Sequence, residues 1–294
     1  MIACARRTRP GNRIGGLALA VVALATFAGA GPAAAQVVYS GSVQTTTGRY
    51  IFAERTTSIF VLTGLDVAAG PVRISATIPF ITQSTPWIAY SPVLIPSGGA
   101  ESAQVGDQIR RGKGAGAGGR NVVVVLPADV ARQTGFGDPV FRVGADLFGS
   151  RSATKVVVSG TMKAPLTDPT TGFGTGEWDY GAAVAVSRQQ GPHQVFGTVE
   201  AWRFGDMPDL VIKDGLGYRV GYEGFVRSDR WSVLAAVSGW TTVLDGVDPP
   251  FSVEIGLTRH LGMSGRSVGL IASFGVTEMS PDFSLSLGWR LPFQ

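Results

Sequence analysis

The chain has 294 residues, of which 41 are glycine, 45% are hydrophobic and 16% are charged. Its formal net charge of +4 comes from four arginines in the first 35 residues, so the chain from residue 36 onwards carries 21 basic and 21 acidic side chains. This balance gives no reason to expect a nucleic-acid partner. The single cysteine, Cys4, lies in the same N-terminal segment, and the rest of the chain can form neither a disulfide nor a thiolate metal site.

Residues 1–35 have the three parts of a Sec-type signal peptide. Arginines 6, 7, 9 and 13 form a basic start, residues 14–28 are apolar, and Ala33-Ala34-Ala35 is a small-residue cleavage site. The alternative is an N-terminal membrane anchor, but the apolar stretch is shorter than the roughly 20 residues that a membrane span needs. We therefore expect cleavage near Ala35 and a mature chain of residues 36–294.

Segments of alternating polarity recur along the mature chain, with turn residues between them. They predict twelve strands, at 37–46, 50–67, 71–82, 139–148, 153–164, 177–188, 193–205, 217–228, 230–243, 251–261, 266–277 and 282–293. Connections on the side of the C-terminus are all short, whereas most of those on the other side are longer. Short periplasmic turns and long outer loops are typical of outer-membrane barrels, and a soluble two-sheet sandwich, the alternative fold, gives no reason for this asymmetry.

The two faces of these strands differ in chemistry. One face is apolar, as in Val268, Leu270 and Phe274, and the other is small or polar. Charged side chains gather on the polar face, which predicts that they line the lumen: Arg73, Arg142, Asp146, Lys163, Asp179, Arg219, Glu223, Arg227, Glu254 and Arg290. They either fill a narrow barrel with ion pairs or set the selectivity of a path. The strand at 193–205 mixes aromatic and polar residues in one phase, so the sequence does not identify its lipid face.

A long insertion, residues 83–138, interrupts the strand pattern. Gly114, Gly116 and Gly119 match G-x-G-x-x-G by letter, but a dinucleotide fingerprint follows a strand and opens a helix, whereas here an apolar run follows the glycines. We interpret the segment as a Gly/Ala loop that folds over or into the barrel mouth.

Two histidines, His193 and His260, are the candidates for chemistry. Without cysteines or a nearby carboxylate pattern they do not indicate a metal site. Some membrane barrels are Ser/His hydrolases, but no signature of an outer-membrane lipid hydrolase surrounds either histidine. We therefore expect no catalytic residue, no cofactor and no enzyme.

Motifs between Gly135 and Tyr180 carry a family resemblance. The sequence reads Gly135-Phe136-Gly137-Asp138 before one strand, Lys163-Ala164-Pro165-Leu166-Thr167-Asp168 after the next, then Gly172-Phe173-Gly174-Thr175-Gly176 and Trp178-Asp179-Tyr180. From residue 135 to 293 the chain resembles the outer-membrane transporter family named "MetA-pathway of phenol degradation", although Leu166-Thr167 replaces the family's Thr-Gly. The resemblance implies an outer-membrane barrel related to channels for hydrophobic or aromatic compounds.

The last strand alternates without interruption. Phe283, Leu285, Leu287, Trp289, Leu291 and Phe293 share one face, and Ser284, Ser286, Gly288, Arg290 and Pro292 share the other. A terminal strand that ends in an aromatic resembles the sorting signal that the barrel-assembly machinery reads, except that Gln294 follows Phe293.

These observations predict an all-β protein, a single antiparallel transmembrane barrel in the outer membrane of a Gram-negative bacterium, surrounded by outer-membrane lipid. Its expected function is to pass or bind a small hydrophobic or aromatic solute. The alternatives are a structural or surface-interaction barrel with a closed lumen and a membrane hydrolase.

Overall fold

The computed structural model describes thirteen stretches of the chain, and for residues 89–91, 94–97 and 133 it describes the backbone alone. These stretches are 36–49, 55–84, 89–91, 94–97, 133–148, 153–167, 173–174, 176–205, 213–226, 230–242, 248–262, 265–277 and 279–293. The expected signal peptide and most of the insertion at 83–138 lie outside them. Among the described residues, no helix is long and apolar enough to cross a membrane.

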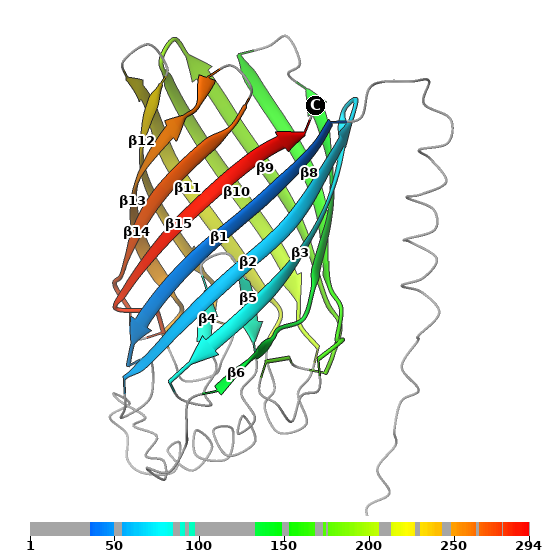
Figure 1. The fold of residues 1–294 in the computed structure, drawn as a ribbon, viewed down its shortest axis with the longest axis vertical. Helices are drawn as coiled ribbons and strands as arrows, with labels where there is room; N and C mark the ends of the chain where they lie inside the picture. Colours follow the sequence, from blue (N-terminus) through cyan, green and yellow to red (C-terminus); the bar gives the residue numbers. More distant parts are fainter. Residues whose placement is uncertain are drawn as a thin grey trace, which may run out of the picture. The chain divides into compact units, whose positions relative to one another are not determined.

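Residues 36–294 form one unit, a closed antiparallel barrel of twelve long strands. The strands are β1 (Gln36–Gly48), β2 (Thr56–Ala69), β3 (Val72–Gln83), β7 (Val140–Phe148), β8 (Thr154–Lys163), β9 (Asp179–Gln190), β10 (His193–Arg203), β11 (Gly215–Val226), β12 (Trp231–Trp240), β13 (Phe251–His260), β14 (Ser267–Gly275) and β15 (Phe283–Phe293). Each pairs with its neighbour in the chain, and β1 pairs with β15 to close the wall (Figure 1). The expected fold class and strand number are confirmed, and the sandwich alternative is wrong.

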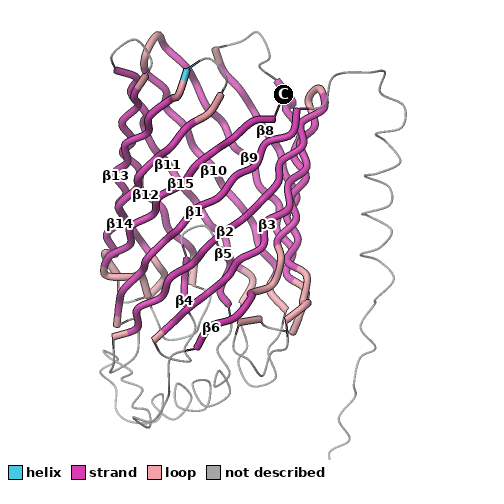
Figure 2. The backbone as a smooth tube through the Cα atoms, in the orientation of Figure 1, coloured by secondary structure: helices cyan, strands magenta, loops and turns pink. Residues whose placement is uncertain are grey.

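Three short strands accompany the barrel. β4 (Ala89–Ser91) and β5 (Leu94–Ser97) form a separate hairpin that approaches β2, and β6 (Gln133–Phe136) pairs with the last residues of β3. The tube in Figure 2 shows the long strands running obliquely to the barrel axis, as strands must to close a barrel.

The connections differ in length between the two ends of the barrel. At the end where β15 finishes, β2 joins β3 and β9 joins β10 through two residues each, Gly70-Pro71 and Gly191-Pro192. Both glycines have φ of 58°. The proline that follows each glycine holds its own φ at about −65°, so only the first of the two turn residues has a positive φ. This combination is typical of a type II′ hairpin turn. At the other end the connections run from 7 residues between β1 and β2 to 15 between β8 and β9 and 56 between β3 and β7. The expected asymmetry is present.

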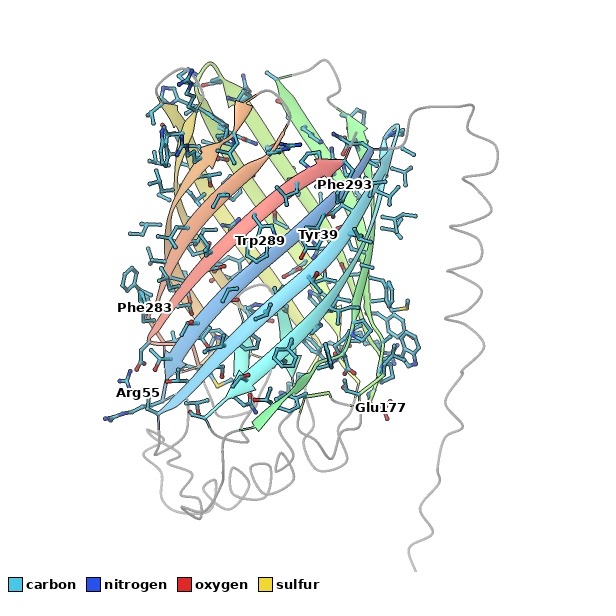
Figure 3. The ribbon with its side chains drawn as sticks, viewed as in Figure 1. Tyr39, Arg55, Glu177, Phe283, Trp289 and Phe293 are labelled. Atoms are coloured by element: carbon cyan, nitrogen blue, oxygen red, sulfur yellow. The ribbon has the colours of Figure 1, made fainter. Side chains whose placement is uncertain are left out.

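The wall is a single layer, so side chains that it buries must point inwards. Along β15 the outward side chains are apolar: Phe283 and Phe293 are exposed and Trp289 is half-buried, and all three are labelled in Figure 3. Trp289 lies across β1 at Gly41, where a Cβ would come within 2.5 Å of the indole ring. Glycine at this position lets the aromatic ring cover the seam where the barrel closes.

The structure identifies the lipid face of β10, which the sequence left open. Val195 and Val199 point outwards, whereas Phe196, Glu200 and Trp202 share the inner phase. Aromatic side chains therefore occupy part of the inside.

Candidate functional site

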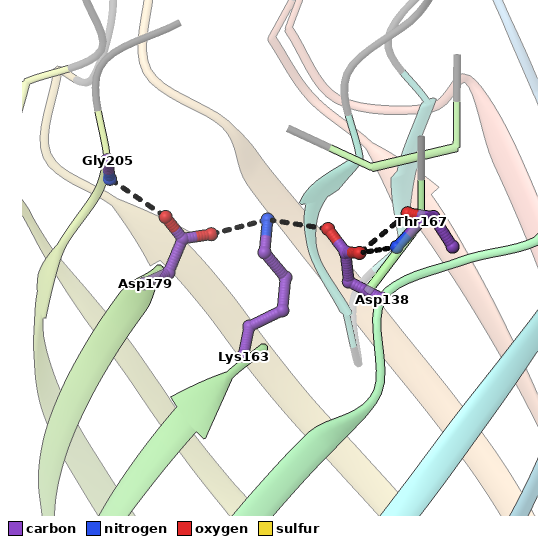
Figure 4. A network of polar contacts seen from close by, with 5 residues as sticks. All are labelled: Asp138, Lys163, Thr167, Asp179 and Gly205. Atoms are coloured by element: carbon purple, nitrogen blue, oxygen red, sulfur yellow. Dashed lines mark hydrogen bonds and ion pairs between the residues drawn. The ribbon is translucent and has the colours of Figure 1, made fainter. Parts of the chain in front are cut away.

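The inside of the barrel near the start of β9 holds a buried ion network (Figure 4). The Lys163 Nζ lies 2.5 Å from Asp179 Oδ2 and 3.9 Å from Asp138 Oδ2, and the three side chains are 5%, 3% and 1% exposed. Two carboxylates therefore share one ammonium group away from water, and each needs further donors. The Gly205 N–H donates to Asp179 at 2.8 Å, while the backbone N–H and hydroxyl of Thr167 donate to Asp138 at 3.0 and 2.6 Å.

The glycines around this network are required by close packing. A Cβ at Gly174 would overlap the Thr167 hydroxyl and lie 2.7 Å from an Asp138 oxygen. At Gly135 it would lie 2.5 Å from the Phe173 ring. The connection between β8 and β9 is therefore held against the wall on both sides of its undescribed part.

An apolar cluster lies beside the network and consists of Phe60, Leu62, Ile81 and Phe173, all buried. Phe60 and Leu62 are on the inner phase of β2 and Ile81 is on that of β3, so the cluster belongs to the inside of the barrel. Phe173 comes from the β8–β9 connection and packs against the wall. A polar-inside pattern does not predict these residues.

Aromatic rings continue around the inner wall on the far side of Lys163. Trp202 stacks on Phe204 at 6.1 Å between ring centroids, and Phe204 contacts Trp240 at 6.0 Å. Further along β10, the Phe196 ring lies 5.1 Å from the Arg219 guanidinium, which is a cation–π contact.

A second ion pair lies in the middle of the barrel. Arg219 donates to Glu254 Oε2 through Nη2 at 2.7 Å and through Nε at 3.2 Å, and the Ser238 hydroxyl donates to Oε1 of the same carboxylate at 2.8 Å. These residues come from β11, β12 and β13, so the pair bridges three strands.

A third charged group lies towards the end where β15 finishes. Asp146 Oδ2 accepts from Lys155 at 2.8 Å and lies 3.5 Å from Arg73 Nη2. Arg142, two positions away on the same face of β7, donates from Nε to the Thr161 hydroxyl at 3.0 Å.

The structure thus groups six of the ten charged residues that the sequence singles out: Arg73 with Asp146, Lys163 with Asp179, and Arg219 with Glu254. Glu223 shares the inner phase of β11 with Arg219, and Arg290 shares that of β15 with Ser284. Arg227 lies outside the described residues. The ten residues predicted from the sequence do not include Asp138 or Lys155. Two signals could have identified them: Asp138 stands in the G-x-G-D motif, and Lys155 lies on the same face of β8 as Lys163.

The histidines make local contacts. The His260 Nε2 lies 3.2 Å from the Ser232 hydroxyl, but Ser232 is buried and the imidazole packs against Phe225. His193 Nδ1 forms a hydrogen bond with the Tyr222 hydroxyl at 2.6 Å. Within the described part of the chain, no three His, Cys, Asp or Glu side chains are grouped as a metal site would require.

Comparisons with known proteins extend this description. No protein-family model matches the chain, and no curated protein matches its sequence. Among solved structures, an outer membrane channel from Pseudomonas putida F1 matches with a TM-score of 0.63 and 12% identity, over 88% of this chain and 95% of that one.

Two further solved structures match with lower scores. The CymD monoaromatic hydrocarbon channel has a TM-score of 0.42 at 8% identity, over 88% of each chain. The toluene transporter TodX of P. putida has 0.44 at 11% identity, over 88% of this chain and 90% of that one. The chain therefore has the fold of an outer-membrane channel, a conclusion that depends on the first match.

Proposed function

We propose that this protein is an outer-membrane channel that passes a small, uncharged hydrophobic or aromatic solute. The observation that carries the proposal is the inner wall, where the half-buried ring of Trp240 lies beside the buried Phe204 and that of Phe196 lies further along β10, in a closed barrel whose outer face is itself apolar. Aromatic rings on the inside are not needed to hold the barrel in lipid, and they offer an apolar solute a surface to bind.

The same proposal assigns the chain to the "MetA-pathway of phenol degradation" family. Its support is that Asp138, Lys163 and Asp179, which stand in three separate motifs of the resemblance, meet in one buried network. The ten charged residues are proposed to line the path, and the ion pairs keep the charge of the wall locally balanced. Export through a signal peptide cleaved near Ala35 and assembly through the last strand belong to this proposal.

Reconstitution tests the function. The purified mature protein in planar bilayers is expected to give small conductance steps, and liposomes that contain it are expected to take up an aromatic solute faster than empty liposomes. Absence of both would contradict the proposal. Fractionation with the outer membrane, and migration on gels that changes on heating, test its location.

A closed structural barrel is the second candidate, and the buried network favours it. Lys163, Asp138 and Phe173 fill part of the inside at one end, as they would in a barrel whose long loops bind a partner. The bilayer measurement separates the two, since a closed barrel neither conducts nor admits solute.

A further inference from the structure

An inward carboxylate on β10 lies among the aromatic rings of the inner wall. Glu200 pairs with Gly217 on β11, and Gly217 pairs with Trp240 on β12, so the three residues form one row across neighbouring strands. A Cβ at Gly217 would lie 2.8 Å from Glu200 Oε1 and 3.2 Å from Trp240 Cε2. The carboxylate and the indole therefore lean over the same glycine, and these two atoms are at most 6.0 Å apart, the sum of the two distances.

Glu200 has no partner inside the barrel. Within the described part of the chain, no group donates a hydrogen bond to its carboxylate and no cation forms an ion pair with it. Arg219, two positions beyond Gly217 on the inner face of β11, is bound to Glu254 instead. On its other side Glu200 pairs with Ala183 of β9, whose methyl group offers no hydrogen bond. A half-buried carboxylate without a counter-ion favours a cation from solution, because it has lost part of its hydration.

Trp240 supplies an aromatic face beside this carboxylate. It shares the inner phase of β12 with Ser238 and is half-buried, whereas Phe204 and Trp202, the rings that continue from it, are 6% and 5% exposed. Trp240 is therefore the ring of the three that keeps open surface. Its backbone N–H donates to the Pro250 carbonyl at 3.0 Å, so the ring is carried by a strand that is held on both sides.

A carboxylate beside an indole selects a class of ligand. Tryptophan is the aromatic side chain that attracts cations most strongly, and its apolar surface favours an ammonium that carries methyl or methylene groups. Divalent metal ions instead prefer several oxygen ligands. Among the described residues, no three His, Cys, Asp or Glu side chains are grouped to provide them. The pair therefore fits an organic ammonium ion better than a metal ion, and its charge disfavours an anion.

We propose that Glu200 and Trp240 bind the cationic head of a small organic amine. The carboxylate lies against the ammonium charge, and the indole lies against the methyl or methylene groups around it. Both side chains keep exposed surface, so the cation reaches them in the structure as it stands. Such a site adds a second class of ligand to the uncharged solute proposed above.

Titration calorimetry of the folded barrel in detergent tests the site with two matched probes, choline and 3,3-dimethylbutan-1-ol, which differ by a carbon atom in place of the ammonium nitrogen. The wild type is expected to bind choline about tenfold more tightly than the alcohol, or more. Glu200→Gln is expected to remove that preference and leave binding of the alcohol unchanged, and Trp240→Leu to weaken choline binding about threefold or more. Asp282→Asn removes a half-exposed carboxylate at the same end of the barrel and is the control, expected to match the wild type.

Three results would overturn the site. The first is a wild type that does not bind choline or binds it no better than the alcohol. The second is a Glu200→Gln or Trp240→Leu barrel that is folded, by heat-modifiable migration on gels, and binds choline as the wild type does. The third is an equal loss of choline binding in Asp282→Asn and Glu200→Gln, since charge alone would then explain it. The titration requires no conductance, so a barrel that binds choline but neither conducts nor admits solute would contradict the channel function and leave the site in place.

Discussion

Lys163 holds two buried carboxylates in place with one ammonium group. Removing it leaves Asp138 and Asp179 facing each other at a site that water does not reach, and such a loss is much more costly than loss of an exposed pair. The three residues come from different motifs, so their network connects the start of β7, the end of β8 and the start of β9.

Lys163→Met is expected to lower the free energy of unfolding by about 3 to 5 kcal/mol. Urea unfolding followed by tryptophan fluorescence measures the change. The double variant with Lys163→Met and Asp179→Asn is expected to lose less free energy of unfolding than Lys163→Met alone, since only one buried carboxylate, Asp138, is then left without the lysine. Arg55→Ala is the control, because its pair with Asp282 is half exposed and is expected to contribute less than about 1 kcal/mol.

Gly174 is a second residue whose side chain, here a single hydrogen, determines local structure. Gly174→Ala is expected to displace Thr167 from Asp138 and release the β8–β9 connection from the wall, because the added methyl group would occupy the hydroxyl's position. Proteolysis of the folded protein should then cut within residues 164–178 faster than in the wild type. Gly191→Ala, in an open turn, serves as the control, and equal cleavage of Gly174→Ala and wild type would contradict the packing described.

At the scale of the element, β15 separates two environments within one residue step. Leu287 points outwards and is exposed, whereas Ser286 points inwards beside Gln44. An arginine on the outside would enter lipid, while one on the inside would meet a polar wall.

Leu287→Arg is expected to destabilise the barrel by about 2 to 4 kcal/mol, and Ser286→Arg by much less. Refolding into lipid vesicles followed by denaturant titration gives both values. If the two variants lost equal stability, the assignment of the faces of β15 would be wrong. Ser286→Arg is in addition expected to lower conductance, since it narrows the inside.

The sequence predicts elements better than it predicts the inside. Alternation identifies each long strand, because lipid outside and polar groups inside impose a period of two. It does not place Phe60 and Leu62 on the inside, because the pattern assumes that inner residues face water and are polar. Here Phe173 packs on Phe60 and Leu62, so these inner positions can be apolar. For the same reason the sequence does not identify the lipid face of β10, where the apolar Trp202 and the charged Glu200 share the inner face.

Contacts between distant residues are a further limit. The motifs identify Asp138, Lys163 and Asp179 separately, but only the pairing of β7 with β8 and of β8 with β9 brings them to one point. The same holds for Lys155: its ion pair with Asp146, on the other side of the turn between β7 and β8, is visible only in the structure.

At the scale of the whole molecule, the barrel has an apolar outer face and paired charges inside, and the proposed solute path runs along its axis. The Arg219–Glu254 pair lies inside the barrel, and the Ser238 hydroxyl donates to Glu254, which makes this serine a probe of the proposed path. The sole cysteine of the chain, Cys4, lies in the expected signal peptide, so a new cysteine can be labelled selectively.

The most direct measurement is the conductance of single Ser238→Cys barrels in planar bilayers before and after a charged, water-soluble thiol reagent. We expect labelling to change the conductance, because the reagent attaches beside the ion pair on the proposed path. Leu287→Cys, which faces lipid, should conduct as before. A Ser238→Cys barrel that is fully labelled, by mass, and whose conductance does not change would contradict a solute path through the barrel.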